Sequence, residues 1–278
     1  MTPAQKIIKN LAFAFAIFLI VSIISGILSA LYALSGVLGL KQEDTQFSGE
    51  METIDFENSE VATLDIDIDF ANIIIKSGDN LISKTDNKYI SCKQNNQNLQ
   101  IREKTHNLFS HANKSDLVIY VPKNLNFKYV KIKAGAGNIQ IEDMNVENLY
   151  LELGAGKTTI NRLNVTNHCQ IASGTGKVKV LSGTINDLKL DIGVGNVEMT
   201  SSITGNSEIN AGIGNLELKI QKTKENYTLE SNSGIGNIKV EGTKISEDGK
   251  YGDGKNIIKI NGGIGNIDIR FERQCPPN

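Results

Sequence analysis

The sequence predicts an all-β protein: a β-solenoid-like repeat domain of about 19–20 residues per coil, preceded by one N-terminal transmembrane helix. Three observations predict it. A G-x-G element recurs seven times, apolar and polar residues alternate around each copy, and a long stretch near the N-terminus carries no charge. The composition agrees, because 26 Gly with 4 Pro and no Trp favours short strands joined by tight turns.

The uncharged apolar run over residues 11–40 is longer than the roughly 20 residues needed to cross a bilayer. It also exceeds the h-region of a signal peptide, about 7 to 15 residues, so we predict an uncleaved transmembrane signal anchor. A cleaved signal is the alternative, because Ala33-Leu34-Ser35 offers small residues to a peptidase. Residues 41–60 are polar and acidic without sustained periodicity, and they are predicted to form a linker.

The charges on either side of this run predict its direction. Lys6 and Lys9 lie within residues 1–10, whereas Lys41 is followed closely by two acidic residues. The positive-inside rule therefore keeps the N-terminus cytoplasmic. The predicted localisation is the cell membrane, single-pass, with an extracytoplasmic C-terminal domain.

The repeat domain is predicted over residues 61–271, with a flexible tail over 272–278. Its seven G-x-G copies are spaced by 19, 20, 19, 19, 22 and 29 residues. Each copy is followed by Asn or Lys and then by an alternating strand. The predicted corners between strands are Gly135 and Gly137, Gly154 and Gly156, Gly174 and Gly176, Gly193 and Gly195, Gly212 and Gly214, Gly234 and Gly236, and Gly263 and Gly265.

Strict alternation identifies half-buried strands, so Leu188, Leu190 and Ile192 are predicted to face the core, with Lys189 and Asp191 facing solvent. Two Gly spaced by one residue allow positive φ at a sharp corner, and the Asn that commonly follows tolerates left-handed geometry. One unit offers two short strands and two turns, too little to close a core. Neighbouring units are therefore expected to stack, with irregular end segments as caps.

Upstream the same pattern continues without glycines. Residues 64–75 alternate on both sides of a small-residue corner, and residues 99–103 and 117–121 are two further strand candidates. Pro122 is expected to end the second of these because it lacks an amide donor. Near the other end, the insert over residues 242–256 leaves the regularity of the last coil open.

Two segments are similar to known ligand-binding motifs, but neither matches its motif fully. No G-x-G copy continues to a third Gly, and each is followed by a strand instead of a helix, which argues against a dinucleotide fingerprint. The segment 262–269 is closer to the calcium-binding nonapeptide of β-rolls, but Asp268 stands one place late. Neither a cofactor nor a metal is predicted.

Asp65, Asp67 and Asp69 imitate the start of an EF-hand loop, which would need Gly where Phe70 stands and Glu where Lys76 stands. Their alternation with isoleucines places all three carboxylates on the solvent face of a strand. We expect water or cations to relieve their crowding.

Catalytic candidates are few. His106, His111 and His168 are the only histidines, and no hydrolase or metalloprotease signature accompanies them. The three cysteines form no C-x-x-C pair, and Cys169, in an alternating stretch, is predicted to pack as a small apolar residue, whereas Cys275 lies in the tail. The balance of 29 Lys plus Arg against 31 Asp plus Glu argues against nucleic acid as a partner.

The sequence resembles the bacterial putative-adhesin, or toastrack, β-strand repeat family (domain of unknown function 4097). The resemblance lies in the seven corners, in the strand 117–121 that Pro122 ends, and in the ending over residues 257–267. The likeness covers roughly residues 61–271. It implies an extracytoplasmic solenoid-like domain, often tied to a membrane segment and linked with cell-envelope stress systems. It brings no catalytic residues.

Three functions follow as hypotheses. The first is a non-enzymatic, membrane-anchored adhesin or envelope interaction module, whose partners besides the membrane would be an envelope protein, a wall component or a lipid component. The alternative is a regulatory or sensor subunit of an envelope stress response that acts through a membrane partner. The third, an envelope hydrolase, stays open because carboxylate pairs are not visible in sequence.

Overall fold

The computed structural model describes residues 52–56, 61–103, 115–245 and 248–272, all of which belong to one compact unit, Gly49–Asn278. The predicted N-terminus 1–10, the anchor 11–40 and nearly all of the tail 272–278 lie outside the described residues. Within the described ranges no helix is long and apolar enough to cross a bilayer.

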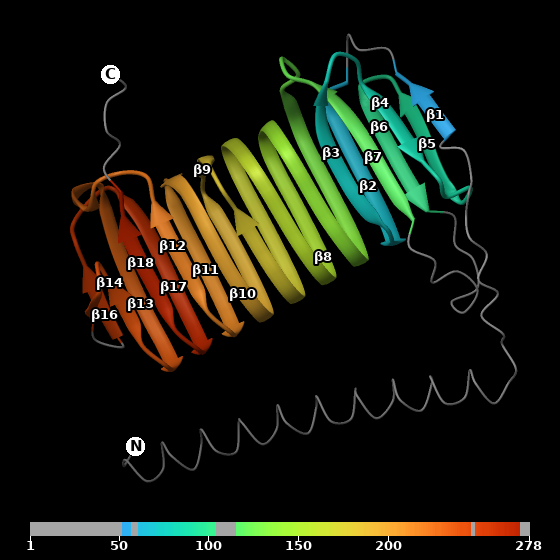
Figure 1. Cartoon of the computed structure of the whole chain (residues 1–278). Helices are drawn as coiled ribbons and strands as arrows, with labels where there is room; N and C mark the ends of the chain where they lie inside the picture. The colour runs from blue at the N-terminus through green and yellow to red at the C-terminus, as the bar shows by residue number, and fades with distance from the viewer. Residues whose placement is uncertain (1–51, 57–60, 104–114, 246–247, 273–278) are drawn as a thin grey trace, which may run out of the picture. The chain divides into compact units, whose positions relative to one another are not determined.

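The described part is all-β (Figure 1). The strands before the regular repeat are β1 (Glu52–Asp55), β2 (Thr63–Phe70), β3 (Asn72–Gly78), β4 (Ile82–Thr85), β5 (Ile90–Asn95), β6 (Asn98–Glu103) and β7 (Asp116–Pro122). The middle strands are β8 (Phe127–Val180), β9 (Gly183–Asn186) and β10 (Leu188–Thr204). The last elements are β11 (Asn206–Ile213), β12 (Leu216–Ile220), the 3-10 turn η1 (Lys224–Asn226), β13 (Tyr227–Ile235), β14 (Ile238–Val240), β15 (Thr243–Lys244), β16 (Asp248–Tyr251), β17 (Asn256–Ile264) and β18 (Ile267–Phe271).

Successive coils pair in parallel and in register, as expected of a solenoid. Strand segments before each corner form one ladder, called face A, in which Leu190 lies beside Ile171 and Ile209. Segments after each corner form face B, in which Val197 lies beside Val178 and Leu216. Hydrogen bonding continues through the corners, which is why β8 spans 54 residues.

A third, short ladder completes the middle coils. Leu163 pairs with Gly183, and Ile185 pairs with both Val165 and Ile203. The predicted unit of two strands and two turns is therefore too simple. One of its turns contains a third short strand, whose buried aliphatic residues close the core on this third side.

Alternation sets the core as the sequence predicts. Leu188, Leu190 and Ile192 are buried, whereas Lys189 is exposed and Asp191 half-buried. Each aliphatic side chain buried in this way contributes about 1.5–3 kcal/mol. Because every coil repeats the pattern, the buried residues form continuous rows along the stack, and these rows hold neighbouring coils together.

At the C-terminal end, neighbours in sequence are not neighbours in the stack. β17 pairs with β11 on one side and with β13 on the other, so that Ile260 lies between Ile209 and Ser231. β18 lies likewise between β12 and β14. Figure 1 shows the two red strands between the orange ones. The last coil in the sequence is thus inserted beneath the coil that precedes it, and it is as regular as the others.

The N-terminal end repeats this arrangement. β2 lies between β6 and β8, so that Ile66 is flanked by Ile101 and Ile132. β3 lies between β7 and β8. The first coil in the sequence is therefore interior to the second. The stacking of sequence neighbours holds only for the middle of the domain.

Antiparallel strands cover both ends, which confirms the expectation of caps. At one end β16 pairs with β13 and β15 with β14. At the other, β5 pairs with β6, β4 with β7, and β1 with β4. Such strands blunt the open edges that would otherwise recruit other chains. β1 falls within the predicted linker 41–60, so the described strands include residues that we predicted to be linker.

Candidate interaction surface

The two glycines of each corner serve different purposes. The second has positive φ, between +138° and +154°, at Gly137, Gly156, Gly176, Gly195, Gly214, Gly236 and Gly265. The first does not, but it lies close to the coil beneath: a Cβ on Gly154, Gly174, Gly193, Gly212, Gly234 or Gly263 would stand 2.0–2.5 Å from a carbonyl oxygen, and one on Gly135 would stand 2.7 Å from that of Asp69. Both glycines form columns along the stack, and the only side chains at this edge of the described repeat are those of the residues between the two glycines.

The Asn after the corner has a different role from the one predicted. None of these asparagines has positive φ; among the described non-glycine residues only Asn96, Asp187 and Glu241 do. Instead the side chains form a ladder across coils. The backbone N–H and Nδ2 of Asn215 donate to Asn196 Oδ1 at 3.0 and 3.3 Å, and the N–H of the next Asn in the stack, at position 266, donates to Asn215 Oδ1 at 3.2 Å.

A second amide ladder lies on face A, two residues before the corner. Asn261 Nδ2 donates to Asn210 Oδ1 at 2.8 Å, and Asn210 Nδ2 donates to Asp191 Oδ1 at 2.7 Å. These bonds fix the three side chains in a row across adjacent coils. The row is therefore ordered before any ligand arrives.

The same row continues with a charged cluster. Tyr150 Oη donates to Glu152 Oε2 at 2.7 Å, and Lys133 Nζ lies 3.4 Å from the same oxygen. The Tyr150 hydrogen bond, followed by that of Lys133, lowers the pKa of Glu152 below its ordinary 4.5 despite partial burial. Glu152 is therefore ionised at neutral pH.

Replacing Tyr150 by Phe removes the largest of these causes, so the pKa of Glu152 is expected to rise toward 4.5. A lowered carboxyl pKa stabilises the fold above the unfolded pKa, and this contribution is lost as the pH falls through the folded pKa. Tyr150→Phe should therefore reduce stability above about pH 4.5, and this difference should disappear as the pH falls through the folded pKa of Glu152. Carboxyl NMR titration of Glu152 measures the shift, with Tyr129→Phe as the control on the same face. An unchanged Glu152 titration would contradict the assignment.

A groove of about 570 Å³ runs across these coils on face A. Its outer rim is the row Glu152, Ala172, Asp191, Asn210 and Asn261, and its floor includes the glycines of the first column. Ala172 lies in register with Asp191 and leaves a notch between the two carboxylates. The groove spans five coils, or about 19 Å at roughly 4.8 Å per strand.

An apolar ridge borders the glycine columns. It consists of the residues between the two glycines of successive corners, in the register Val194, Ile213, Ile264 and Ile235. Val194 and Ile235 are 43% and 47% exposed, and the other two are half-buried. Isolated exposed aliphatic residues are common, but four in a continuous row mark a candidate contact surface.

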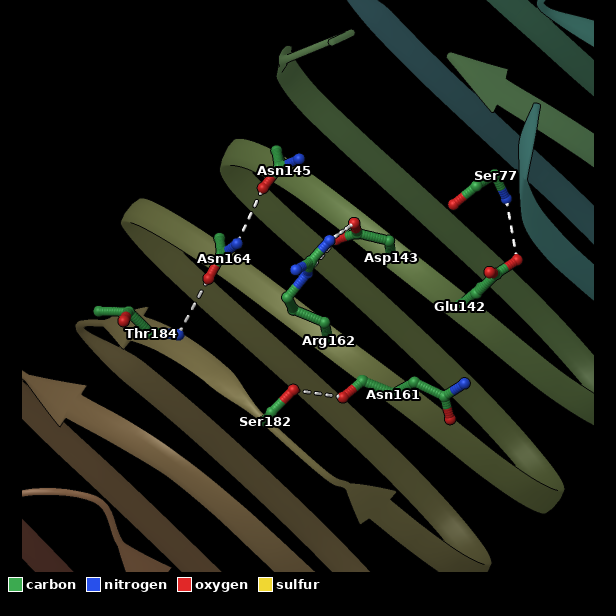
Figure 2. A network of polar contacts seen from close by, with 9 residues as sticks. All are labelled: Ser77, Glu142, Asp143, Asn145, Asn161, Arg162, Asn164, Ser182 and Thr184. Atoms are coloured by element: carbon green, nitrogen blue, oxygen red, sulfur yellow. Dashed lines mark hydrogen bonds and ion pairs between the residues drawn. The ribbon is translucent and has the colours of Figure 1, made fainter. Parts of the chain in front are cut away.

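The side chains at the turn after face B are largely paired with one another (Figure 2). Figure 2 shows Arg162 directed at Asp143 of the preceding coil, where its Nε donates to Oδ1 at 2.9 Å. Asn164 Nδ2 donates to Asn145 Oδ1 at 2.9 Å, and Asn164 Oδ1 accepts from the N–H of Thr184 at 3.2 Å. This surface contributes mainly to coil stacking.

Of the aspartates in the EF-hand-like segment, Asp67 and Asp69 are exposed as predicted, whereas Asp65 is half-buried. Asp65 forms an ion pair with Arg102, and Asp67 lies in register with Arg102 and Lys133. The relieving cations are thus side chains of adjacent coils. No group of three or more potential metal ligands occurs within the described ranges.

The remaining predicted candidates are scattered. His168 is exposed, whereas Cys169 is buried and its thiol pKa is strongly raised by burial, which fits the predicted packing role. His106, His111 and Cys275 lie outside the described residues. Sequence reasoning missed the groove altogether.

The sequence matches the Toastrack DUF4097 family over residues 52–260, most of the described domain. The chain belongs to this family. The Toastrack match begins at Glu52, where β1 also begins. A comparison with curated proteins found no match.

Three solved structures are similar to this Toastrack domain. A putative cell adhesion protein from Clostridium sporogenes is 16% identical, with 80% of this chain and 99% of that chain covered and a TM-score of 0.39. A putative adhesin from Bacteroides fragilis is 18% identical, with 80% and 98% covered and a TM-score of 0.42. A putative lipid binding protein from Parabacteroides distasonis is 17% identical, with 80% and 97% covered and a TM-score of 0.40.

Proposed function

We propose that this Toastrack protein is a non-enzymatic, membrane-anchored module that binds a cell-envelope partner outside the cytoplasm, as an adhesin would. The observation that carries the proposal is the pairing of the groove with the apolar ridge on one edge of a rigid stack. The rim side chains are already held by hydrogen bonds, so binding costs little ordering entropy.

The anchor and its direction belong to the same proposal. They are supported by the apolar run 11–40 and by Lys6 and Lys9 before it. Protease treatment of intact cells, with mass analysis of the N-terminus, tests topology and signal cleavage together. Digestion of the β-domain with an intact residue 1–40 segment is expected. Protection of the β-domain on intact cells would contradict the proposal.

The binding surface is tested by a photo-crosslinking amino acid at Val194 in the full-length chain on intact cells. Thr166, exposed on the third side of a middle coil, is the matched control position. We expect a discrete envelope product from position 194 and none from position 166. Equal products at both positions, or none at either, would oppose this surface. Loss of the product when the anchor is replaced by an unrelated span would favour the sensor function instead.

A further inference from the structure

We infer that the groove on face A binds a linear polysaccharide, neutral or amine-bearing, that lies along the stacking axis across the coils. This inference rests on the proposed function and names the chemical class of its partner. It follows from the shape of the groove, the polar groups on its rim, the apolar ridge next to it, and the charge around it.

The shape fits an extended polymer. The groove is shallow, and it crosses the strands for about 19 Å instead of closing around a point. Its floor is made in part by Gly154, Gly174 and Gly193, so a chain can approach the backbone closely without meeting side chains. A compact ligand would contact only one or two of the five rim positions.

The rim offers hydrogen-bond partners suited to hydroxyl and amide groups. Asp191 Oδ1 accepts from Asn210 while its Oδ2 lies 4.0 Å from Lys189 Nζ, and Glu152 Oε2 accepts from Tyr150. Each carboxylate oxygen can accept more than one hydrogen bond, so both carboxylates retain acceptor capacity. Asn261 donates within the ladder through Nδ2, and that bond does not use its carbonyl oxygen. Acceptors thus recur at every second coil, roughly 9.6 Å apart at about 4.8 Å per strand, which suits a polymer with hydroxyl donors on every unit.

The aliphatic ridge lies next to the groove and outside its lining. Val194, Ile213 and Ile264 lie side by side just beyond the glycine column that ends the groove. A sugar ring presents hydroxyls at its edge and C–H groups on its faces. It can therefore contact the polar rim and the apolar ridge at the same time.

Two other occupants fit less well. The backbone N–H and C=O groups of β8, β10, β11 and β17 are used in ladders between coils, so this face offers no edge to which a peptide strand can add. Within the described chain the groove is lined by two carboxylates and by no Lys or Arg. Lys133 and Lys189 lie 3.4 and 4.0 Å from these carboxylates and offset their charge. A phosphate-rich polymer or an anionic lipid surface would therefore find no net positive charge along the lining of the groove.

The test uses the purified full-length chain with chitohexaose, the hexamer of N-acetylglucosamine, and with its deacetylated form, and follows binding by titration calorimetry. Heparin serves as the anionic polymer. Ala172→Arg fills the notch with a long side chain on an outward position, and Thr159→Arg on face B is the matched control. We expect at least one hexamer to bind and Ala172→Arg to weaken it about tenfold or more, while Thr159→Arg leaves it unchanged.

Several results would overturn the inference: no binding of either hexamer, equal affinities of Ala172→Arg and the unaltered chain, or tighter binding of heparin that Ala172→Arg abolishes. Circular dichroism confirms that both arginine variants keep the fold. Failure here is separable from failure of the proposed function. If neither hexamer binds but Ala172→Arg abolishes the cellular crosslink at position 194, the surface stands and the polysaccharide assignment is wrong.

Discussion

Replacing Gly195 by Ala is expected to destabilise the domain by about 4 kcal/mol or more, a loss reserved for severe structural conflicts. A Cβ at this position would lie 1.7 Å from the carbonyl oxygen of Gly176, and the backbone φ of +154° is itself unfavourable for an L-residue. Gly176 has little room to retreat, because a Cβ built on it would likewise lie 1.7 Å from the carbonyl oxygen of Gly156. Urea unfolding of the full-length chain measures the loss.

Two further alanine variants separate the causes of that loss. Gly193 lacks a positive φ, but a Cβ there would lie 2.5 Å from the Gly174 carbonyl oxygen, so Gly193→Ala measures crowding alone. Gly242 has φ +74° with nothing within 4 Å, so Gly242→Ala measures backbone strain alone, about 1–2 kcal/mol. We expect Gly195→Ala to exceed both. Equal effects at Gly195 and Gly242 would show that the columns are loosely packed.

The buried rows of the core were predictable because apolar and polar residues alternate along each strand, which leaves only one face of the strand able to be buried. Leu188, Leu190 and Ile192 could not point outward without exposing the whole row, so their burial follows from local sequence. The corner glycines were also predictable, because a repeated G-x-G indicates a repeated backbone geometry. The Asn after each corner was interpreted from the tolerance of asparagine for left-handed backbone geometry. Its role depends on the Asn of the next coil, which local reasoning does not consider.

The order of coils could not be derived in this way. Every corner carries nearly the same motif, so the coil at Gly212 can stack as well under Gly263 as under Gly234. The one sequence feature that indicated the changed coil order was the interval of 29 residues before Gly263, which contains the antiparallel strands β15 and β16. These strands cover the coil at Gly234 from outside, so the only remaining place for the last coil is beneath it.

The groove was hidden for a related reason. Glu152, Ala172 and Asp191 are 20 and 19 residues apart, and their proximity appears only when the coils are superimposed by their corners. Considered alone, Ala172 is an ordinary strand residue. In the stack it lies between the coil of Glu152 and the coil of Asp191, so its small side chain leaves a gap in the polar row.

The coil order makes a sharp prediction for a chain that ends at Glu241. This truncation removes the covering strands β15 and β16 together with the layer between β11 and β13, and with that layer the buried residues Ile258, Ile260, Ile267 and Ile269. At about 1.5–3 kcal/mol each, their loss is comparable to the whole stability of a typical domain. We expect a much lower melting temperature and loss of amide-exchange protection in β13 and β14.

A chain that ends at Glu272 is the control, because it retains every described strand and should melt like the full-length protein. If coils followed the sequence order, β13 would rest directly on β11, and the chain ending at Glu241 would keep its protection there. Persistent protection of β13 in the shortened chain would therefore contradict the inserted coil. Its loss, with protection of β8 and β10 retained, is the expected result, because β13 then has neither β17 on one side nor β16 on the other.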